Sequence, residues 1–277
     1  MKIFTDTSTL YSPKEGEQIG VKVLPLSVSV NGKTYKEYEE IQPEAFLKEV
    51  QAGGTPTSSQ PSIGEVMEAF ESYDDEILVL SMADGLSGTY QSAVGAKESV
   101  DNNERIHVMN TKTLCGPHRY LLERAKQLKD ESLSLHAIKE RLQIAIDDNK
   151  SFLIPRDFAF LKRGGRMTPA AATIGGLLKI VPIMTQTEDG KRLEKAGIKR
   201  TFKAAVAETM KWFEEHKYQN GYRFYVTHAG ALEDAKLAVA MIQEKLGVTN
   251  TEIYHLSPAF ITQGGPLCVA IQAIKEV

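Results

Sequence analysis

The chain has 277 residues, 42% hydrophobic and 25% charged, so it is long enough to bury a core without disulfides or metals. Its 33 basic and 36 acidic side chains give a formal net charge of -3, which argues against nucleic-acid binding. The cysteines, Cys115 and Cys268, form no CxxC motif, so neither a disulfide scaffold nor a thiolate metal site is predicted. The opening apolar run is too short for a signal peptide or a membrane-spanning helix. We therefore expect a cytoplasmic protein with no integral membrane segment.

The first half of the chain alternates predicted strands with predicted helices. Apolar runs predict strands at residues 2–5, 19–30, 77–80 and 106–109, with a hairpin turn at Asn31-Gly32. Apolar residues at helical spacing, together with start signals, predict helices at 43–51, from 63 onward, at 90–100, 118–128 and 135–147. The second helix start has the clearest signal, because Ser62-Ile63-Gly64-Glu65 has the S-x-x-E pattern of a capping box. This alternation predicts a three-layer α/β/α domain with a mainly parallel sheet.

The second half has shorter and less evenly spaced strand candidates. They fall at residues 152–154, 180–184, 223–226, 252–254 and 267–271, with helices expected at 202–216 and 232–246. This pattern favours a mixed sheet. The sequence therefore predicts two α/β domains, an N-terminal one over residues 1–154 and a C-terminal one over residues 155–277.

Three hydroxyl-rich stretches occupy places where ligands bind in open α/β sheets. Asp6–Thr9 follows the first strand, Thr55–Ser62 leads into a helix, and Gly85–Ser92 joins a buried strand to a helix. Hydroxyls and free backbone N–H groups at helix starts suit an anion. Taken singly, each stretch is better explained by helix capping than by ligand binding.

Several kinds of chemistry have no support in the sequence. Ser87 lies in Gly-Leu-Ser-Gly-Thr, which lacks the spacing of a nucleophile elbow. No phosphate-binding P-loop occurs, and the six histidines show no H-E-x-x-H spacing. We therefore predict no metal and no cofactor.

The second half adds basic candidates. Leu161–Arg166 places three cations around a glycine pair, a pattern that is more often a solvated turn than a site. Arg200 stands just before a predicted helix, where a cation opposes the helix dipole and so becomes a candidate for binding an anion or a partner. His228 is as well explained by a structural role as by a place in a site.

The order of six motifs resembles that of the DegV family over essentially the whole chain. The motifs are Thr5–Ser8, Thr57–Ser62, Gly85–Ala93, Arg163–Arg166, His228–Gly230 and Gly264–Pro266. The resemblance implies a two-domain α/β protein that binds one long-chain fatty acid between its domains. It also implies the role of the fatty-acid-binding subunit of bacterial fatty acid kinase, in which a separate ATP-binding subunit phosphorylates the acyl carboxylate. On this basis the chain alone is expected not to be an enzyme.

The resemblance also implies roles for individual residues. Ser58 and Ser87 match the family's carboxylate-binding hydroxyls, and the neighbouring Ser59, Thr89, Gln263 and Gly264 complete the expected ligand site. Arg200 matches the arginine thought to face the kinase, and Arg166 ends the Gly-Gly-Arg motif and is grouped with it as a partner-binding residue.

Two positions depart from the family pattern. Gln263 stands where the family usually has a histidine, and Leu267 replaces the glycine after Gly-Pro. Glutamine keeps a donor and an acceptor but cannot carry a proton as an imidazolium does. If that histidine assists phosphoryl transfer, this chain would bind lipid yet serve the kinase poorly.

A fatty acid would draw its affinity mainly from its tail. Roughly 15 methylenes at about 0.8 kcal/mol each would give on the order of 12 kcal/mol before association costs. One hydrogen bond to the carboxylate adds about 1.5–3 kcal/mol, so the hydroxyls mainly set orientation. Apolar residues available to line a tunnel, each equally well explained as ordinary core, are Ile63, Val66, Met67, Phe70, Phe158, Phe160, Ile174, Leu177 and Leu178.

Two alternatives stay open at this stage. The chain could bind another amphiphile without a kinase partner, or it could be an enzyme acting on a small anionic substrate with Asp6 or His228 as acid or base.

Overall fold

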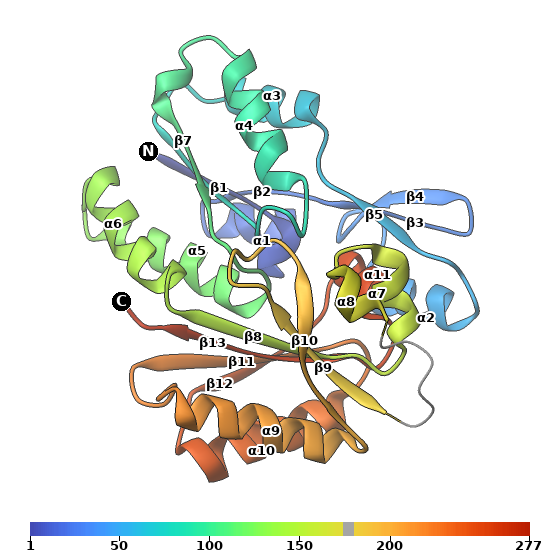
Figure 1. Cartoon of the computed structure of the whole chain (residues 1–277). Helices are drawn as coiled ribbons and strands as arrows, with labels where there is room; N and C mark the ends of the chain where they lie inside the picture. The colour runs from blue at the N-terminus through green and yellow to red at the C-terminus, as the bar shows by residue number, and fades with distance from the viewer. Residues whose placement is uncertain (174–179) are drawn as a thin grey trace.

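The structure is a computed structural model that describes residues 1–173 and 180–277 (Figure 1). The strands are β1 (Lys2–Asp6), β2 (Lys22–Leu24), β3 (Ser27–Val30), β4 (Lys33–Lys36), β5 (Thr57–Ser59), β6 (Ile77–Ser81), β7 (Ile106–Asn110), β8 (Asn149–Ile154), β9 (Val181–Gln186), β10 (Leu193–Lys199), β11 (Tyr222–His228), β12 (Thr251–His255) and β13 (Val269–Lys275). The helices are α1 (Pro13–Gln18), α2 (Pro43–Gln51), α3 (Ile63–Glu71), α4 (Thr89–Ser99), α5 (Gly116–Asp130), α6 (Leu135–Ile146), α7 (Phe158–Gly164), α8 (Pro169–Ala172), α9 (Phe202–Glu215), α10 (Leu232–Leu246) and α11 (Pro258–Gly264), with short 3₁₀ turns at Thr7–Thr9 and Asn103–Arg105.

The first sheet is parallel and has the strand order β2-β1-β6-β7. Its strands alternate side chains between two faces. Phe4, Ile77 and Val79 pack under α3 and α4, whereas Ile3 and Leu78 pack against α5 and α6 on the other face. The three-layer α/β/α arrangement with a parallel sheet is therefore confirmed.

The second sheet is mixed, as predicted, and has the order β10-β9-β8-β13-β11-β12. All its pairs are antiparallel except β11 with β12. Helices α9 and α10 cover one face, and α5 and α6 reach part of the other face, where they contact Tyr225 and Ile274. The predicted domain boundary after residue 154 stays a prediction. Strand β8 lies on the N-terminal side of that boundary, yet it pairs with β13 and β9 of the second sheet.

A small antiparallel sheet, β4-β3-β5, lies beside α11. Its hairpin turns at Asn31 and Gly32, whose φ angles of 52° and 75° fit a turn with two left-handed residues, so the predicted hairpin is confirmed. Strand β5 pairs with β3 and carries Ser58. This sheet therefore places one predicted site residue next to a helix from the far end of the chain.

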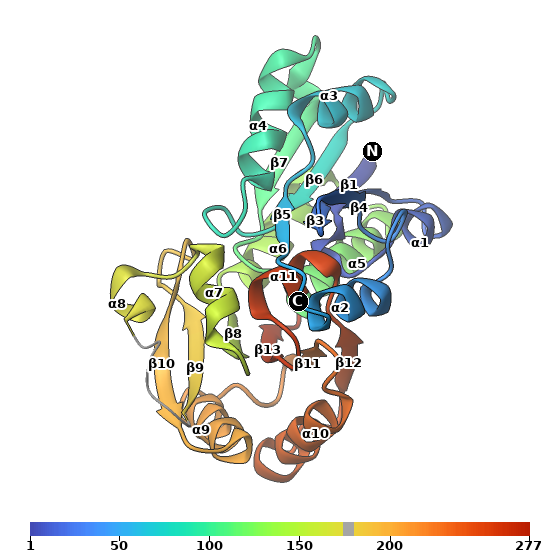
Figure 2. The same ribbon diagram turned by 90° about the vertical axis from the view of Figure 1, so that its right-hand side faces the viewer.

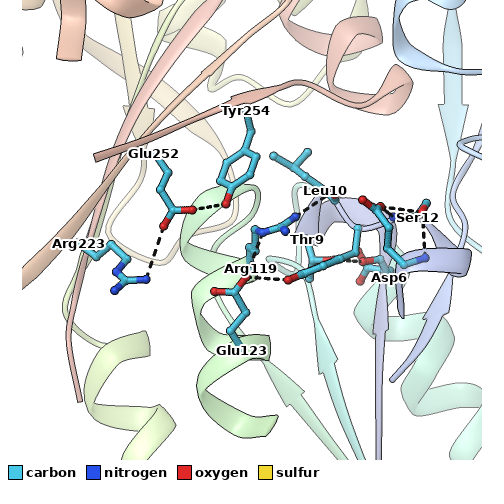
Figure 3. A network of polar contacts seen from close by, with 11 residues as sticks. Asp6, Thr9, Leu10, Ser12, Arg119, Glu123, Arg223, Glu252 and Tyr254 are labelled. Carbon is cyan, nitrogen blue, oxygen red and sulfur yellow. Dashed lines mark hydrogen bonds and ion pairs between the residues drawn. The ribbon is translucent and has the colours of Figure 1, made fainter. Parts of the chain in front are cut away.

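A polar network ties the two halves together around Arg119 of α5 (Figure 3). The guanidinium donates to the carboxylate of Glu123 at 3.1 Å and to the carbonyl of Leu10 at 3.3 Å. It also stacks on the ring of Tyr254 in β12, 4.6 Å from its centroid, and Tyr254 donates to Glu252 on the same strand. Because α5 packs on both sheets, this network fixes their relative position.

Sequence patterns did not predict some elements that form only by pairing with distant segments of the chain. Strand β10 forms the exposed edge of the second sheet, and its sequence LEKAGIK has too few apolar residues to signal a strand. The predicted apolar stripe of α3 is also incomplete, since Val66 and Phe70 are buried but Ile63 is 47% exposed. Among the helices that the structure describes, none combines the length and apolar character needed to cross a bilayer.

Candidate functional site

A cavity lies against the second sheet, on the face opposite α9 and α10. Strands β8, β9 and β13 form one wall, and β5, α7, α11 and the loops after β6 and β7 form the other (Figure 2). The space between them is about 1010 Å³, including the part that opens to solvent. The cavity therefore draws its walls from both halves of the chain.

The alternation of side chains along β13 leaves space for the cavity, because the large residues of this strand point to the other face of the sheet. On β13, Val269 and Ile271 point to the other face and pack in the core under α9 and α10. Cys268, just before the strand, and Ala270 line the cavity, and both are small. Most of the remaining lining is apolar and includes Leu86, Leu153, Leu161, Met184, Leu256 and Phe260. A cavity of this kind suits an apolar ligand.

One end of the cavity is polar and is built from four distant segments. Gln263 of α11 donates from Nε2 to the hydroxyl of Ser58 on β5, at 3.2 Å. The hydroxyl of Ser87 lies 2.8 Å from that of Thr89, the first residue of α4. Arg166, which follows α7, donates from Nε to the carbonyl of Leu86 at 3.2 Å. Hydroxyls, an amide and a guanidinium thus share this end, a donor set that suits an anionic group.

Glycines allow these segments to approach closely. A Cβ on Gly88 would lie 2.9 Å from Nε2 of Gln60, which brings the segment after β5 against the Ser87 loop. A Cβ on Gly164 would lie 2.0 Å from Oε1 of Gln263. Gly165 then ends α7 with φ at 69°, a conformation that favours glycine. The predicted cationic turn is therefore a helix end packed against the site rather than a freely solvated loop.

The predicted site residues have different places in this arrangement. Ser58, Ser59, Ser87, Gln263 and Gly264 line the cavity, and so does Arg166. Thr89 does not line it, but its hydroxyl holds that of Ser87. Arg200 lies elsewhere, in an exposed turn between β10 and α9.

The first hydroxyl-rich stretch does not reach the cavity, although the other two do. Its groups are buried and engaged within the protein. Thr7 donates to Glu37, the hydroxyl of Ser8 lies 2.7 Å from Nδ1 of His118, and Asp6 accepts from the backbone N–H groups of Ser8 and Met82. This stretch therefore ends the parallel sheet instead of contributing ligand donors.

His228 is also remote from the cavity lining. It lies across from His255 on the neighbouring strand, and burial lowers its pKa. Its Nδ1 accepts from the backbone N–H of Ala231 at 3.2 Å. Since neither Asp6 nor His228 lines the cavity, the geometry gives no support to an acid–base role for them there.

The apolar residues considered for a tunnel pack elsewhere. Val66 and Phe70 belong to the core around Phe4, and Phe160 belongs to a core cluster beneath α11. Neither these nor Ile63, Met67 and Phe158 line the cavity, whereas Ile174, Leu177 and Leu178 lie outside the described residues. Ordinary core is the better interpretation for five of the six described residues, whereas Ile63 is exposed.

Sequence reasoning missed a polar group at the sheet. Ser151 on β8, Thr185 and Gln186 on β9, and Gln272 on β13 all line the cavity. Of these four residues, Gln272 could have been found from the sequence, because it is the one polar residue in the apolar run Val-Ala-Ile-Gln-Ala-Ile. Within residues 1–173 and 180–277, no three His, Cys, Asp or Glu side chains lie close enough together to hold a metal ion.

Comparisons with known proteins agree with this architecture. A family model described as an uncharacterised protein of the DegV family matches residues 1–276. A DegV domain-containing protein of Halalkalibacterium halodurans is 31% identical over 271 residues, covering 95% of this chain and 94% of that protein.

Two solved structures are similar over nearly their full lengths. A DegV family protein from Thermus thermophilus, described by its fatty acid binding, is 30% identical with a TM-score of 0.87, covering 99% of both chains. DegV of Bacillus subtilis, described as a fatty acid binding protein, is 28% identical with a TM-score of 0.83, again covering 99% of both. The match of sequence and fold along the whole length means that the chain belongs to the DegV family.

Proposed function

We propose that this protein binds a long-chain fatty acid, with the tail in the apolar cavity and the carboxylate at its polar end. The observation that carries the proposal is the division of the cavity lining. Apolar side chains make up more than half of it, Ser58, Ser87, Arg166 and Gln263 gather at one end, and a second polar group lies on the sheet side, formed by Ser151, Thr185, Gln186 and Gln272. The fatty acid binding described for the Thermus thermophilus and Bacillus subtilis proteins supports the same ligand class.

The two ends of such a ligand need different surroundings. Each buried methylene contributes about 0.8 kcal/mol, so a long tail supplies most of the affinity. A carboxylate taken out of water loses more than this unless it gains hydrogen bonds and a counter-charge. The hydroxyl of Ser87 accepts from the N–H of Thr89 at 3.3 Å and lies 2.8 Å from the Thr89 hydroxyl; when Thr89 donates in that pair, the Ser87 proton is available to a carboxylate oxygen. Arg166 supplies the positive charge.

We further propose that the protein presents the bound carboxylate to a separate fatty acid kinase subunit. The family resemblance supports this role, and Arg200 offers an exposed cation for such a partner. The chain would then hold the substrate while the ATP-binding subunit performs the phosphorylation.

The ligand can be tested on purified protein by native mass spectrometry followed by lipid extraction. We expect one bound mass of fatty-acid size, and weaker binding in Ser87→Ala by about ten- to hundredfold, because a hydrogen bond to a charged group is worth about 1.5–3 kcal/mol. Ser99→Ala is a matched control, since within residues 1–173 and 180–277 the Ser99 hydroxyl bonds only to the carbonyl of Gly95 in α4. Protein that neither carries nor takes up a fatty acid would refute the proposal.

A further inference from the structure

Along one face of β13, the side chains first line the cavity and then, further along the strand, pack in a hydrophobic core. Cys268 and Ala270 line the cavity, and so does Gln272, four residues beyond Cys268. The next side chain on that face is Ile274, which is fully buried in the core formed with α5 and α6. The cavity therefore ends at Gln272, where helices begin to cover the sheet.

Gln272 is fixed at this place by its hydrogen bonds. It is fully buried, and its Nε2 donates to the carbonyl of Leu114 at 3.0 Å and to the hydroxyl of Ser151 at 2.9 Å. Its Oε1 accepts from the backbone N–H of Gly116 at 3.4 Å. Displacing the amide would leave these buried groups without partners, so the side chain is a firm barrier rather than a movable one.

These bonds leave Gln272 without a donor for a head group. Both N–H groups of its amide are already used, one of them by the Ser151 hydroxyl, which accepts it and keeps its own proton. The carbonyl of Ser151 accepts from the Thr185 hydroxyl at 2.9 Å. A carboxylate placed here would find one hydroxyl but no donor from Gln272, whereas Arg166, the charged residue of the described lining, lies beside Leu86 and Gly164, so the end of an alkyl tail is the better occupant.

The distance from Gln272 to the part of the polar end formed by Gln263 follows from strand geometry. Cys268 lies beside Gln263, because a Cβ on Gly264, the neighbour of Gln263, would be 2.5 Å from its sulfur. Four residues of antiparallel strand from Cys268 to Gln272 span about 13 Å. An extended alkyl chain with bonds of about 1.5 Å advances about 1.25 Å per bond, so this stretch matches about ten bonds.

We infer that Gln272 closes the tail end of the cavity and sets the length of acyl chain that this protein accepts. The inference rests on the proposed fatty acid binding. It adds a specificity-determining residue, because chains longer than the distance to Gln272 must fold back or leave methylenes in water.

The inference can be tested by measuring affinity for a series of saturated fatty acids of increasing length. For the wild-type protein, affinity should rise about fourfold per methylene up to a limit and then level off or fall. In Gln272→Ala the three bonds from Cβ to Nε2 are lost, so the limit should move up by about three methylenes. Gln272→Met keeps the side-chain length, so its limit should stay while its unfolding temperature drops, because Leu114, Ser151 and Gly116 lose their partner.

Ala270→Leu provides the opposite change. It adds side-chain volume to the same wall, two residues nearer the polar end, and should shorten the limit. This variant shows that the tail runs along β13; if Gln272→Ala does not fold, Gln272→Asn, shorter by one methylene, takes its place and should raise the limit by about one methylene. A length limit that is the same in the wild-type protein and in the folded variants would overturn the inference and leave fatty acid binding intact. Failure of the wild-type protein to bind any chain length would instead refute the proposed function itself.

Discussion

Replacing Gly164 by alanine tests whether Gln263 belongs to the head-group site. Gly164 is the last residue of α7, and its missing Cβ leaves room for the Gln263 side chain. An added Cβ would lie 2.0 Å from Oε1 and 3.2 Å from Cδ of Gln263. Both distances are too short for non-bonded atoms, so the amide must rotate away and lose its 3.2 Å hydrogen bond to Ser58.

The expected effects on stability nearly cancel. Gly→Ala within a helix gains up to about 1 kcal/mol, and less at a helix end. Loss of one neutral hydrogen bond costs about 1 kcal/mol. The unfolding free energy of Gly164→Ala should therefore stay within about 1 kcal/mol of the wild-type value. Fatty acid affinity should fall by about ten- to hundredfold if the Gln263 amide donates to the carboxylate, since that bond is worth about 1.5–3 kcal/mol.

The assay combines denaturant unfolding with titration of a fatty acid into delipidated protein. Gly95→Ala in the interior of α4 is the matched control, because its Cβ would meet only Ile63, at 3.6 Å. That variant should gain about 0.5–1 kcal/mol of stability and bind the ligand normally. Wild-type affinity in a folded Gly164→Ala protein would show that Gln263 does not touch the head group.

Three further predictions concern buried and exposed groups. Burial raises the pKa of Glu37 from 4.5 to about 7 despite its hydrogen bonds from Thr7 and Ala259, so the residue is protonated more readily in the folded state. The contribution of Glu37 to the unfolding free energy is full below about pH 4.5 and falls by about 3 kcal/mol as the pH rises to about 7. Glu37→Gln should remove this pH dependence from unfolding free energies measured across that range. An unchanged slope in the variant would contradict the assignment. Gly116→Ala places a Cβ 2.2 Å from Cγ of buried Tyr225 and should cost about 3 kcal/mol in denaturant unfolding, whereas an unchanged midpoint would mean that the packing is looser than described. Arg200→Ala should keep its fatty acid in native mass spectrometry but yield little acyl phosphate with the kinase subunit and ATP, and normal turnover would remove Arg200 from the partner surface.

Local sequence signals predicted the helix boundaries that depend on residues close to them in the chain. The Ser62–Glu65 capping box starts α3 at Ile63 as predicted. The apolar spacing from Leu232 to Leu246 gives the exact bounds of α10, which ends at Gly247 in the left-handed conformation. In each case the signal lies within a few residues of the structure it specifies.

The site was predicted only in part. Ser58, Ser87 and Gln263 entered through resemblance to a family, and all three line the cavity. Arg166 was expected to face a partner, yet the structure places it at the cavity, with its Nε donating to Leu86. The partner role of Arg166 stays untested, but its position is a consequence of packing between α7 and the loop after β6, which local sequence does not encode.

The chain's own order of apolar runs, caps and turns was enough to determine an α/β protein with a parallel and a mixed sheet, because strand and helix periodicity and turn chemistry act over a few residues. Tertiary structure alone decided that a cavity opens on one face of β13 and that it stops at Gln272. Those features depend on which helices cover which stretch of the sheet, and hence on contacts between segments such as α5 and β13 that lie more than a hundred residues apart.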